Sequence, residues 1–119
     1  MPLLTNGFAS HEALEEHFET HVLIQNEFPS ITTEDEYLEK ADKFLTEPLN
    51  SATTEQCQRL KIDGSRSDIV RYNRITQEFG ILSIHNFIRT YFIPTPTGRW
   101  SHGFRTNYDY FLWNCGRRR

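Results

Sequence analysis

The chain has 119 residues, of which 37% are hydrophobic, 24% charged and 13% aromatic. This is the composition of one globular domain, and it excludes a disordered chain. No apolar run approaches the roughly 18 residues that cross a bilayer, and the first residues lack the basic and apolar regions of a secretory signal. Two cysteines, Cys57 and Cys115, are too few for a disulfide scaffold or a zinc finger, so we expect a cytoplasmic protein.

The net charge of −3 conceals an asymmetry between the two halves of the chain. Residues 1–58 carry twelve acidic and two basic side chains, whereas residues 59–119 carry eleven basic and four acidic ones. Ten of those eleven bases are arginines, which suit two-pronged contacts with phosphate. One surface of the second half could therefore bind nucleic acid. The alternative is that the two halves neutralise each other across their interface.

The first predicted element is a helix that begins at His11, with Ser10 as its cap and acidic side chains in its first turn. Phe28-Pro29 ends it. The residues that share one stripe at helical spacing are Leu14, Phe18, His21 and Gln25. Because an imidazole in an apolar stripe needs a polar partner, His21 is either a core histidine with such a partner or a histidine that faces a cleft.

A second helix is predicted behind the capping box formed by Thr33 and Glu36, and Pro48 closes it. Residues 50–58 are polar and are predicted to be a connector. The hydrophobic period then changes from 3.6 to 2, which predicts short strands over residues 59–62, 68–72, 78–83 and 87–93. Connections this short favour an antiparallel meander over parallel crossovers.

A loop over residues 94–103 and a last helix over residues 108–115, capped by Thr106 or Asn107, complete the prediction. The order indicates an α+β fold in which N-terminal helices pack on a roughly four-stranded antiparallel sheet, with a short C-terminal helix. We expect residues 1–119 to form one domain with flexible termini at 1–10 and 116–119. The side chains expected in the core are Leu14, Phe18, Tyr37, Ala41, Phe44, Val70, Ile81, Ile88 and Phe92.

Polar side chains within these elements are the candidates for chemistry. His17 and His21 lie one helical turn apart, but a zinc-protease helix requires Glu directly after the first His, and no third ligand follows at metal spacing. We therefore expect no metal site. Arg71 and Arg89 lie among apolar neighbours in predicted strands, where an arginine either faces solvent or binds an anion. Tyr91 is either a core aromatic or a site residue. Alternation within the strand puts Arg89 and Tyr91 on one face unless a bulge intervenes.

The sequence has no nucleophilic-serine motif, no phosphate-binding glycine loop and no CxxC pair. Cleavage of RNA by its own 2′-hydroxyl needs no such motif and no cofactor. It needs a base, an acid and cations around a phosphate, which His, Arg, Thr and Tyr side chains supply.

Six segments together carry a resemblance to a known family. Their order and spacing resemble small bacterial toxin domains of the barnase, EndoU, colicin and RelE-type ribonuclease group, which occur at the C-termini of contact-dependent inhibition and other polymorphic toxins. The segments are LEEHFETH (14–21), EYLEKADKFL (36–45), DIVRYN (68–73), EFGIL (78–82), IRTYFIP (88–94) and HG followed by TNYDYF (102–111). The resemblance implies helices before a four-stranded antiparallel sheet and metal-independent cleavage of RNA, often tRNA. It also implies restraint by a cognate immunity protein or antitoxin.

From the resemblance, the element order and the basic second half, we expect a ribonuclease toxin without a cofactor. His21 is the expected general acid or base, and Arg71 and Arg89 are expected to hold the scissile phosphate in the same cleft. Thr90 and Tyr91 would position that phosphate, and His102 would be a second proton-transfer group. The side chains expected to bind the substrate are His17, Arg59, Lys61 and Arg99.

Two other functions are consistent with the same sequence. The net acidity favours a non-catalytic binding module derived from a toxin fold. A small metal-binding protein built on His17 and His21 is a further alternative, which a zinc titration without a response would exclude.

Overall fold

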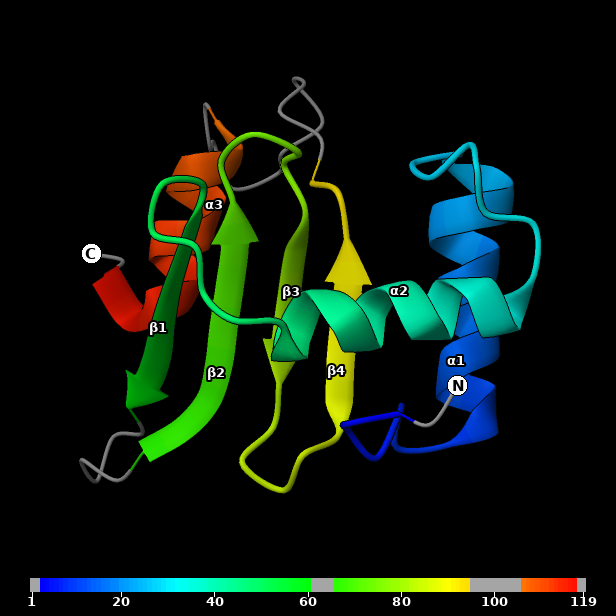
Figure 1. The fold of residues 1–119 in the computed structure, drawn as a ribbon, viewed down its shortest axis with the longest axis horizontal. Helices are drawn as coiled ribbons and strands as arrows, with labels where there is room; N and C mark the ends of the chain where they lie inside the picture. Colours follow the sequence, from blue (N-terminus) through cyan, green and yellow to red (C-terminus); the bar gives the residue numbers. More distant parts are fainter. Residues whose placement is uncertain (1–2, 61–65, 95–105, 118–119) are drawn as a thin grey trace.

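The computed structural model describes residues 3–60, 66–94 and 106–117. It contains the predicted α+β arrangement, in which helices precede a four-stranded antiparallel sheet of order β1-β2-β3-β4 and a short helix follows it (Figure 1). The strands are β1 (Thr54–Leu60), β2 (Arg66–Asn73), β3 (Phe79–Leu82) and β4 (Ile88–Phe92). None of the helices in the described ranges is long and apolar enough to span a bilayer.

The first helix, α1 (His11–Phe18), begins where its cap predicts, because the Ser10 side chain accepts a hydrogen bond from the backbone N–H of Ala13. It continues as a π-helical segment, η1 (Glu19–Ile24). A π-helical turn holds more residues than an α-helical turn, so the buried face shifts along the sequence. Val22 is buried as a result, and Gln25, which the helical stripe places on the same face, is exposed.

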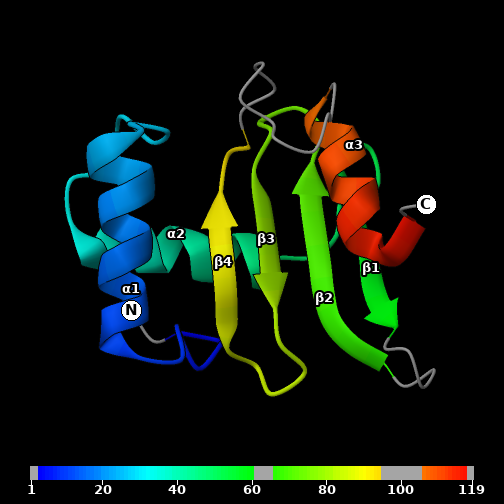
Figure 2. The ribbon, with the colours of Figure 1, turned by 180° about the vertical axis from the view of Figure 1, so that it is seen from behind.

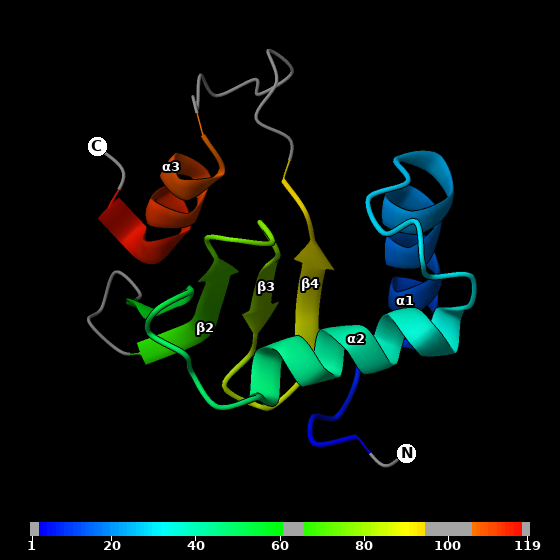
Figure 3. The same ribbon diagram turned by 45° about the horizontal axis from the view of Figure 1, so that its top comes forward.

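The second helix, α2 (Glu34–Thr46), has the predicted capping box of Thr33 and Glu36. It crosses one face of the sheet, while α3 (Asn107–Leu112) lies on the other face, near β1 and β2 (Figures 2 and 3). The α2 face of the sheet carries Gly80, Leu82, Ile88 and Tyr91, and the α3 face carries Val70, Tyr72, Phe79 and Ile81. The sheet therefore separates two apolar cores.

Gly80 in β3 allows α2 to approach the sheet closely. A Cβ atom at this position would lie 3.0 Å from a terminal carbon of Leu45 and 3.3 Å from the ring of Phe44. Both of those side chains belong to α2 and are buried. The missing side chain thus provides the space that they fill.

The polar segment expected to be a connector contains most of β1. Its residues 54–58 pair with β2, from Thr54 opposite Asn73 to Gln58 opposite Ile69. Because β1 is the edge of the sheet and is largely polar, it lacks the apolar alternation from which strands are predicted. Of the predicted core, Leu14 and Phe92 are partly buried and the other seven side chains are buried.

The N-terminal segment, for which the sequence predicts a flexible terminus, is held by hydrogen bonds from residue 4 onward. The buried carboxylate of Asp42 in α2 accepts the backbone N–H groups of Leu4 at 3.0 Å and Thr5 at 2.8 Å. Phe8 forms a parallel bridge with Ile88 at the free edge of β4. The segment therefore joins α2 to the β4 edge.

At the other end of the chain, α3 continues as a π-helical segment, η2 (Trp113–Arg117), and Thr106 supplies its cap as one of two predicted candidates. A disulfide joins Cys115 of η2 to Cys57 of β1. The sequence does not predict this bond. Because disulfides are rare in the reducing cytosol, the small number of cysteines does not support the expected cytoplasmic location.

Candidate functional site

The strongest candidate for proton transfer is a histidine held by a buried carboxylate. His21 of η1 donates from Nδ1 to Oε2 of Glu27 at 2.8 Å, and the two side chains are only 14% and 6% exposed. The other oxygen of Glu27 accepts the backbone N–H of Ile93 at 2.7 Å. Because a carboxylate only accepts hydrogen bonds, Nδ1 of His21 carries a proton and Nε2 is the nitrogen that can exchange one.

His21 lies in a column of stacked rings between α1 and β4. Its ring centroid is 4.8 Å from that of Phe92 and 5.8 Å from that of His17, and His17 in turn lies 5.2 Å from Phe8. Burial lowers the pKa of His17, and the neighbouring His21 lowers it further. A positive charge on His21 therefore disfavours protonation of His17.

A depression of about 360 Å³ is lined by the two histidines and by other side chains of α1 and η1. Its rim includes Glu16 and Glu19, whose carboxylates repel a phosphate. On the side of His21 where Phe92 stacks, β4 carries Thr90 and Phe92 on the α3 face of the sheet. Figure 2 shows β3 and β4 between α1 and α3 on this face.

A bulge in β4 places Arg89 on that same α3 face. The register shifts so that Ile88 pairs with Leu82 while Thr90 pairs with Ile81. Nε of Arg89 lies 2.9 Å from Oδ1 of the buried carboxylate of Asp68 in β2, with which it forms an ion pair. The expectation from plain alternation, that Arg89 shares a face with Tyr91, is therefore corrected by the bulge.

The same Asp68 carboxylate binds a second arginine. Arg59 of β1 lies 3.5 Å from Oδ2 of Asp68, and it donates from Nε to the backbone carbonyl of Asn114 at 2.9 Å. We call Arg59, Asp68 and Arg89 the arginine–aspartate cluster. It brings together two of the arginines that are expected from the sequence to bind phosphate or substrate.

Arg71 and Tyr91 lie on the opposite, α2 face of the sheet. Arg71 is buried and donates from Nη1 to the carbonyls of Phe44 at 2.9 Å and Glu47 at 2.7 Å, at the end of α2. Tyr91 is wholly buried, its hydroxyl donates to Glu78, and burial together with that carboxylate raises its pKa. Arg71 and Arg89 therefore lie on opposite faces of the sheet and do not share one cleft, and Tyr91 is a core aromatic.

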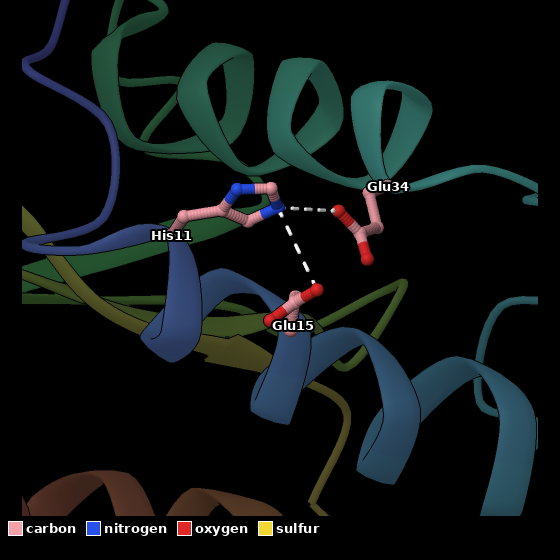
Figure 4. Close-up of side chains that lie close together, drawn as sticks. All are labelled: His11, Glu15 and Glu34. Atoms are coloured by element: carbon pink, nitrogen blue, oxygen red, sulfur yellow. Dashed lines mark hydrogen bonds and ion pairs between the residues drawn. The ribbon is translucent and has the colours of Figure 1, made fainter.

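The remaining predicted residues are Lys61, Arg99 and His102, and they lie outside the described residues. Within the described ranges, the group with the spacing of metal ligands is His11, Glu15 and Glu34 (Figure 4). Nε2 of His11 lies 3.1 Å from Glu34 and 3.8 Å from Glu15, and their ligand atoms lie within 4.8 Å of one another. His11 and Glu15 are exposed and Glu34 is partly buried, and His11 already contacts both carboxylates. His11 lies ten residues before His21 on the same helical element. A metal held there would not serve the His21–Glu27 pair.

No protein-family model matches this chain, and no curated protein matches it either.

Proposed function

We propose that this chain is an endoribonuclease that cleaves RNA by attack of the 2′-hydroxyl on the adjacent phosphate. The observation that carries the proposal is the His21–Glu27 pair, in which a buried carboxylate orients an imidazole next to a sheet face that carries Thr90. An imidazole suits proton transfer near neutral pH, and a carboxylate behind it stabilises the imidazolium that forms.

In the proposed reaction, Nε2 of His21 takes the proton from the 2′-hydroxyl. The 2′-oxygen forms a bond to phosphorus and the bond from phosphorus to the 5′-oxygen breaks. The products are a 2′,3′-cyclic phosphate and a 5′-hydroxyl, whose proton comes from a second group, for which His17 and His102 are the candidates. The Thr90 hydroxyl supplies a donor to an oxygen of that phosphate. The reaction balances without a metal or an added oxidant. Arg71 and Tyr91 are left out of this set because they are bound in the core.

The test is RNA cleavage by His21→Ala and Glu27→Gln, measured beside thermal unfolding of the same preparations. His21→Ala is expected to lower cleavage by about a hundredfold or more, because a positioned acid or base contributes about that much. Glu27→Gln is expected to lower it by at least about tenfold, because the amide no longer fixes the tautomer. His85→Ala, at an exposed turn histidine, is the matched control and should retain full activity.

Three outcomes would contradict the proposal. If His21→Ala unfolds the protein, His21 is a core histidine. If His21→Ala folds and cleaves like the parent, the site is wrong. If the parent cleaves no RNA after any bound partner has been removed, the chain is not a ribonuclease.

A toxin role is part of the proposal, with a cognate immunity protein or antitoxin as the partner that restrains it. Induced expression should then halt growth and leave nicked RNA, with tRNA the first substrate to examine. Expression of His21→Ala should not halt growth.

One observation favours a second function, a non-catalytic binding module. Residues 1–39 contain nine acidic residues and no Lys or Arg. Four of the nine, Glu12, Glu15, Glu16 and Glu19, are exposed on the α1–η1 element. Such a surface fits a basic protein partner better than RNA. A parent protein that binds a partner tightly but cleaves no RNA would favour this function.

A further inference from the structure

The arginine–aspartate cluster has features of a phosphate site. Asp68 is 6% exposed, and its two oxygens contact Arg89 and Arg59. Two guanidinium groups around one carboxylate leave a net positive charge. Arg89 is the accessible member, because its side chain is 57% exposed. In the described part of the chain, the ion pair of Arg89 uses Nε. Both Nη atoms can therefore donate to a second anion.

The guanidinium of Arg89 is directed away from His21, toward β2. His21 stacks on Phe92, whereas Arg89 lies three residues earlier in β4, about 10 Å away at the ordinary rise of ~3.3 Å per residue. The Arg89 side chain also extends across the sheet to Asp68 in β2, two strands from β4. Neighbouring strands are about 4.8 Å apart, so this adds to the separation. The two side chains are therefore placed to bind different phosphates.

We propose that Arg89, held by Asp68, binds a second phosphate of the same RNA strand, at least one nucleotide away from the scissile phosphate. This inference rests on the proposed function for the identity of the ligand. Asp68 fixes the direction of the Arg89 guanidinium, and Arg59 offsets the charge of Asp68, so the exposed edge of Arg89 is presented in one orientation. The substrate is then a single-stranded segment longer than a dinucleotide, and binding of its two phosphates sets the register of cleavage.

The experiment measures affinity for 2′-O-methyl oligoribonucleotides of mixed sequence, two, three, four and six nucleotides long, at several salt concentrations. These probes lack the attacking hydroxyl, so the intact parent protein binds them without cutting. For the parent, affinity should rise several-fold once the probe is long enough to carry the second phosphate. Arg89→Ala should abolish that rise and reduce the slope of log K against log salt by about 0.7, the value for one phosphate contact on a single strand.

Two further variants make the result specific. Arg89→Lys should keep the slope of log K against log salt but show a several-fold smaller rise in affinity with probe length. The reason is that an ammonium group cannot make the forked contact with phosphate or replace the contact of Nε with Asp68. Lys43→Ala removes one exposed positive charge from α2, across the sheet, and should change neither quantity. Circular dichroism of each variant confirms that it is folded.

Equal weakening of the shortest and longest probes by Arg89→Ala would overturn the inference, because Arg89 would then contact the same phosphate as His21. A rise that persists in Arg89→Ala would overturn it as well. The two proposals fail separately. If the parent shows the Arg89-dependent rise in affinity but cleaves no RNA, the second phosphate site is supported and the ribonuclease proposal fails. If the parent cleaves RNA but its affinity does not rise with probe length, the ribonuclease proposal is supported and the second phosphate site fails.

Discussion

Arg71 has a structural role that its position in an apolar strand does not reveal. A buried guanidinium needs acceptors, and the sequence suggests a carboxylate or a phosphate. The structure supplies neutral acceptors instead, namely the carbonyls of Phe44 and Glu47 and the side-chain oxygen of Gln56. The carbonyls at the end of a helix carry partial negative charge and lack helical partners, so a cation is stabilised there.

Replacement of Arg71 should therefore affect stability more than catalysis. Arg71→Ala is expected to lower the free energy of unfolding by about 3 kcal/mol, because hydrogen bonds to a charged group contribute about 1.5–3 kcal/mol and the carbonyls would be left unpaired. Urea unfolding at equilibrium measures this. Lys43→Ala is the control and should change stability by less than about 0.5 kcal/mol. An Arg71→Ala protein as stable as the parent but unable to cleave RNA would restore the catalytic assignment.

The candidate site could be predicted from the sequence only in part, for reasons that are visible at single residues. The helical stripe singles out His21 as an imidazole that needs a partner. Its partner Glu27 could not be identified, because the contact depends on the path of the chain after the π-helical segment. The role of Asp68 could not be predicted either, because its contact with Arg89 depends on a bulge for which the sequence has no turn signal. Local patterns find the reactive group, whereas tertiary contacts supply the groups that orient it.

Among the elements, the helices were easier to predict than the strands. Ser10 and the pair of Thr33 and Glu36 are local signals, and each helix begins where its cap predicts. Strand β1 was missed over residues 54–58 because an edge strand covered on one side by α3 needs few apolar residues. The sequential strand order was predictable because the short connections join neighbouring antiparallel strands and are too short for crossovers.

The packing of α2 against β3 predicts the effect of one added methyl group. Gly80→Ala should lower stability by about 1–2 kcal/mol, because the new Cβ meets Leu45 at 3.0 Å and the core has to shift. Leu45→Ala makes room for that methyl, so the double variant should lose less stability than the sum of the single variants. A double-mutant cycle measured by urea unfolding tests this. Strict additivity would contradict the proposed contact.

At the scale of the whole molecule, one sheet carries an apolar core on each face, and the disulfide links the helical segment that covers the α3 core to the sheet. The α3 core consists of Val70, Tyr72, Phe79, Ile81 and Phe111. The bond between Cys57 and Cys115 ties the far end of that layer to the edge strand. Pairing of these two cysteines could not be predicted from the sequence, because they are 58 residues apart and the side of the sheet that α3 covers is decided by tertiary packing.

Reduction of the disulfide should destabilise the protein without abolishing the fold. A cross-link that closes a loop of this length restricts the unfolded chain and stabilises the folded one by about 4 kcal/mol. Thermal unfolding with and without dithiothreitol should show a lower midpoint for the reduced protein. A Cys57→Ser/Cys115→Ser variant should unfold at the reduced midpoint under both conditions. An unchanged midpoint of the parent on reduction would show that the bond contributes nothing.

The disulfide also makes nearly half of the polypeptide a covalent ring. Stretched by its two ends, the oxidised chain would stop short of its full contour by about 200 Å, the length of the 58-residue segment at ~3.5 Å per residue. A narrow channel would have to admit two strands side by side at the ring, whereas the reduced chain passes as one. A single-molecule pulling experiment should therefore show a final extension step of about that length only when a reductant is present.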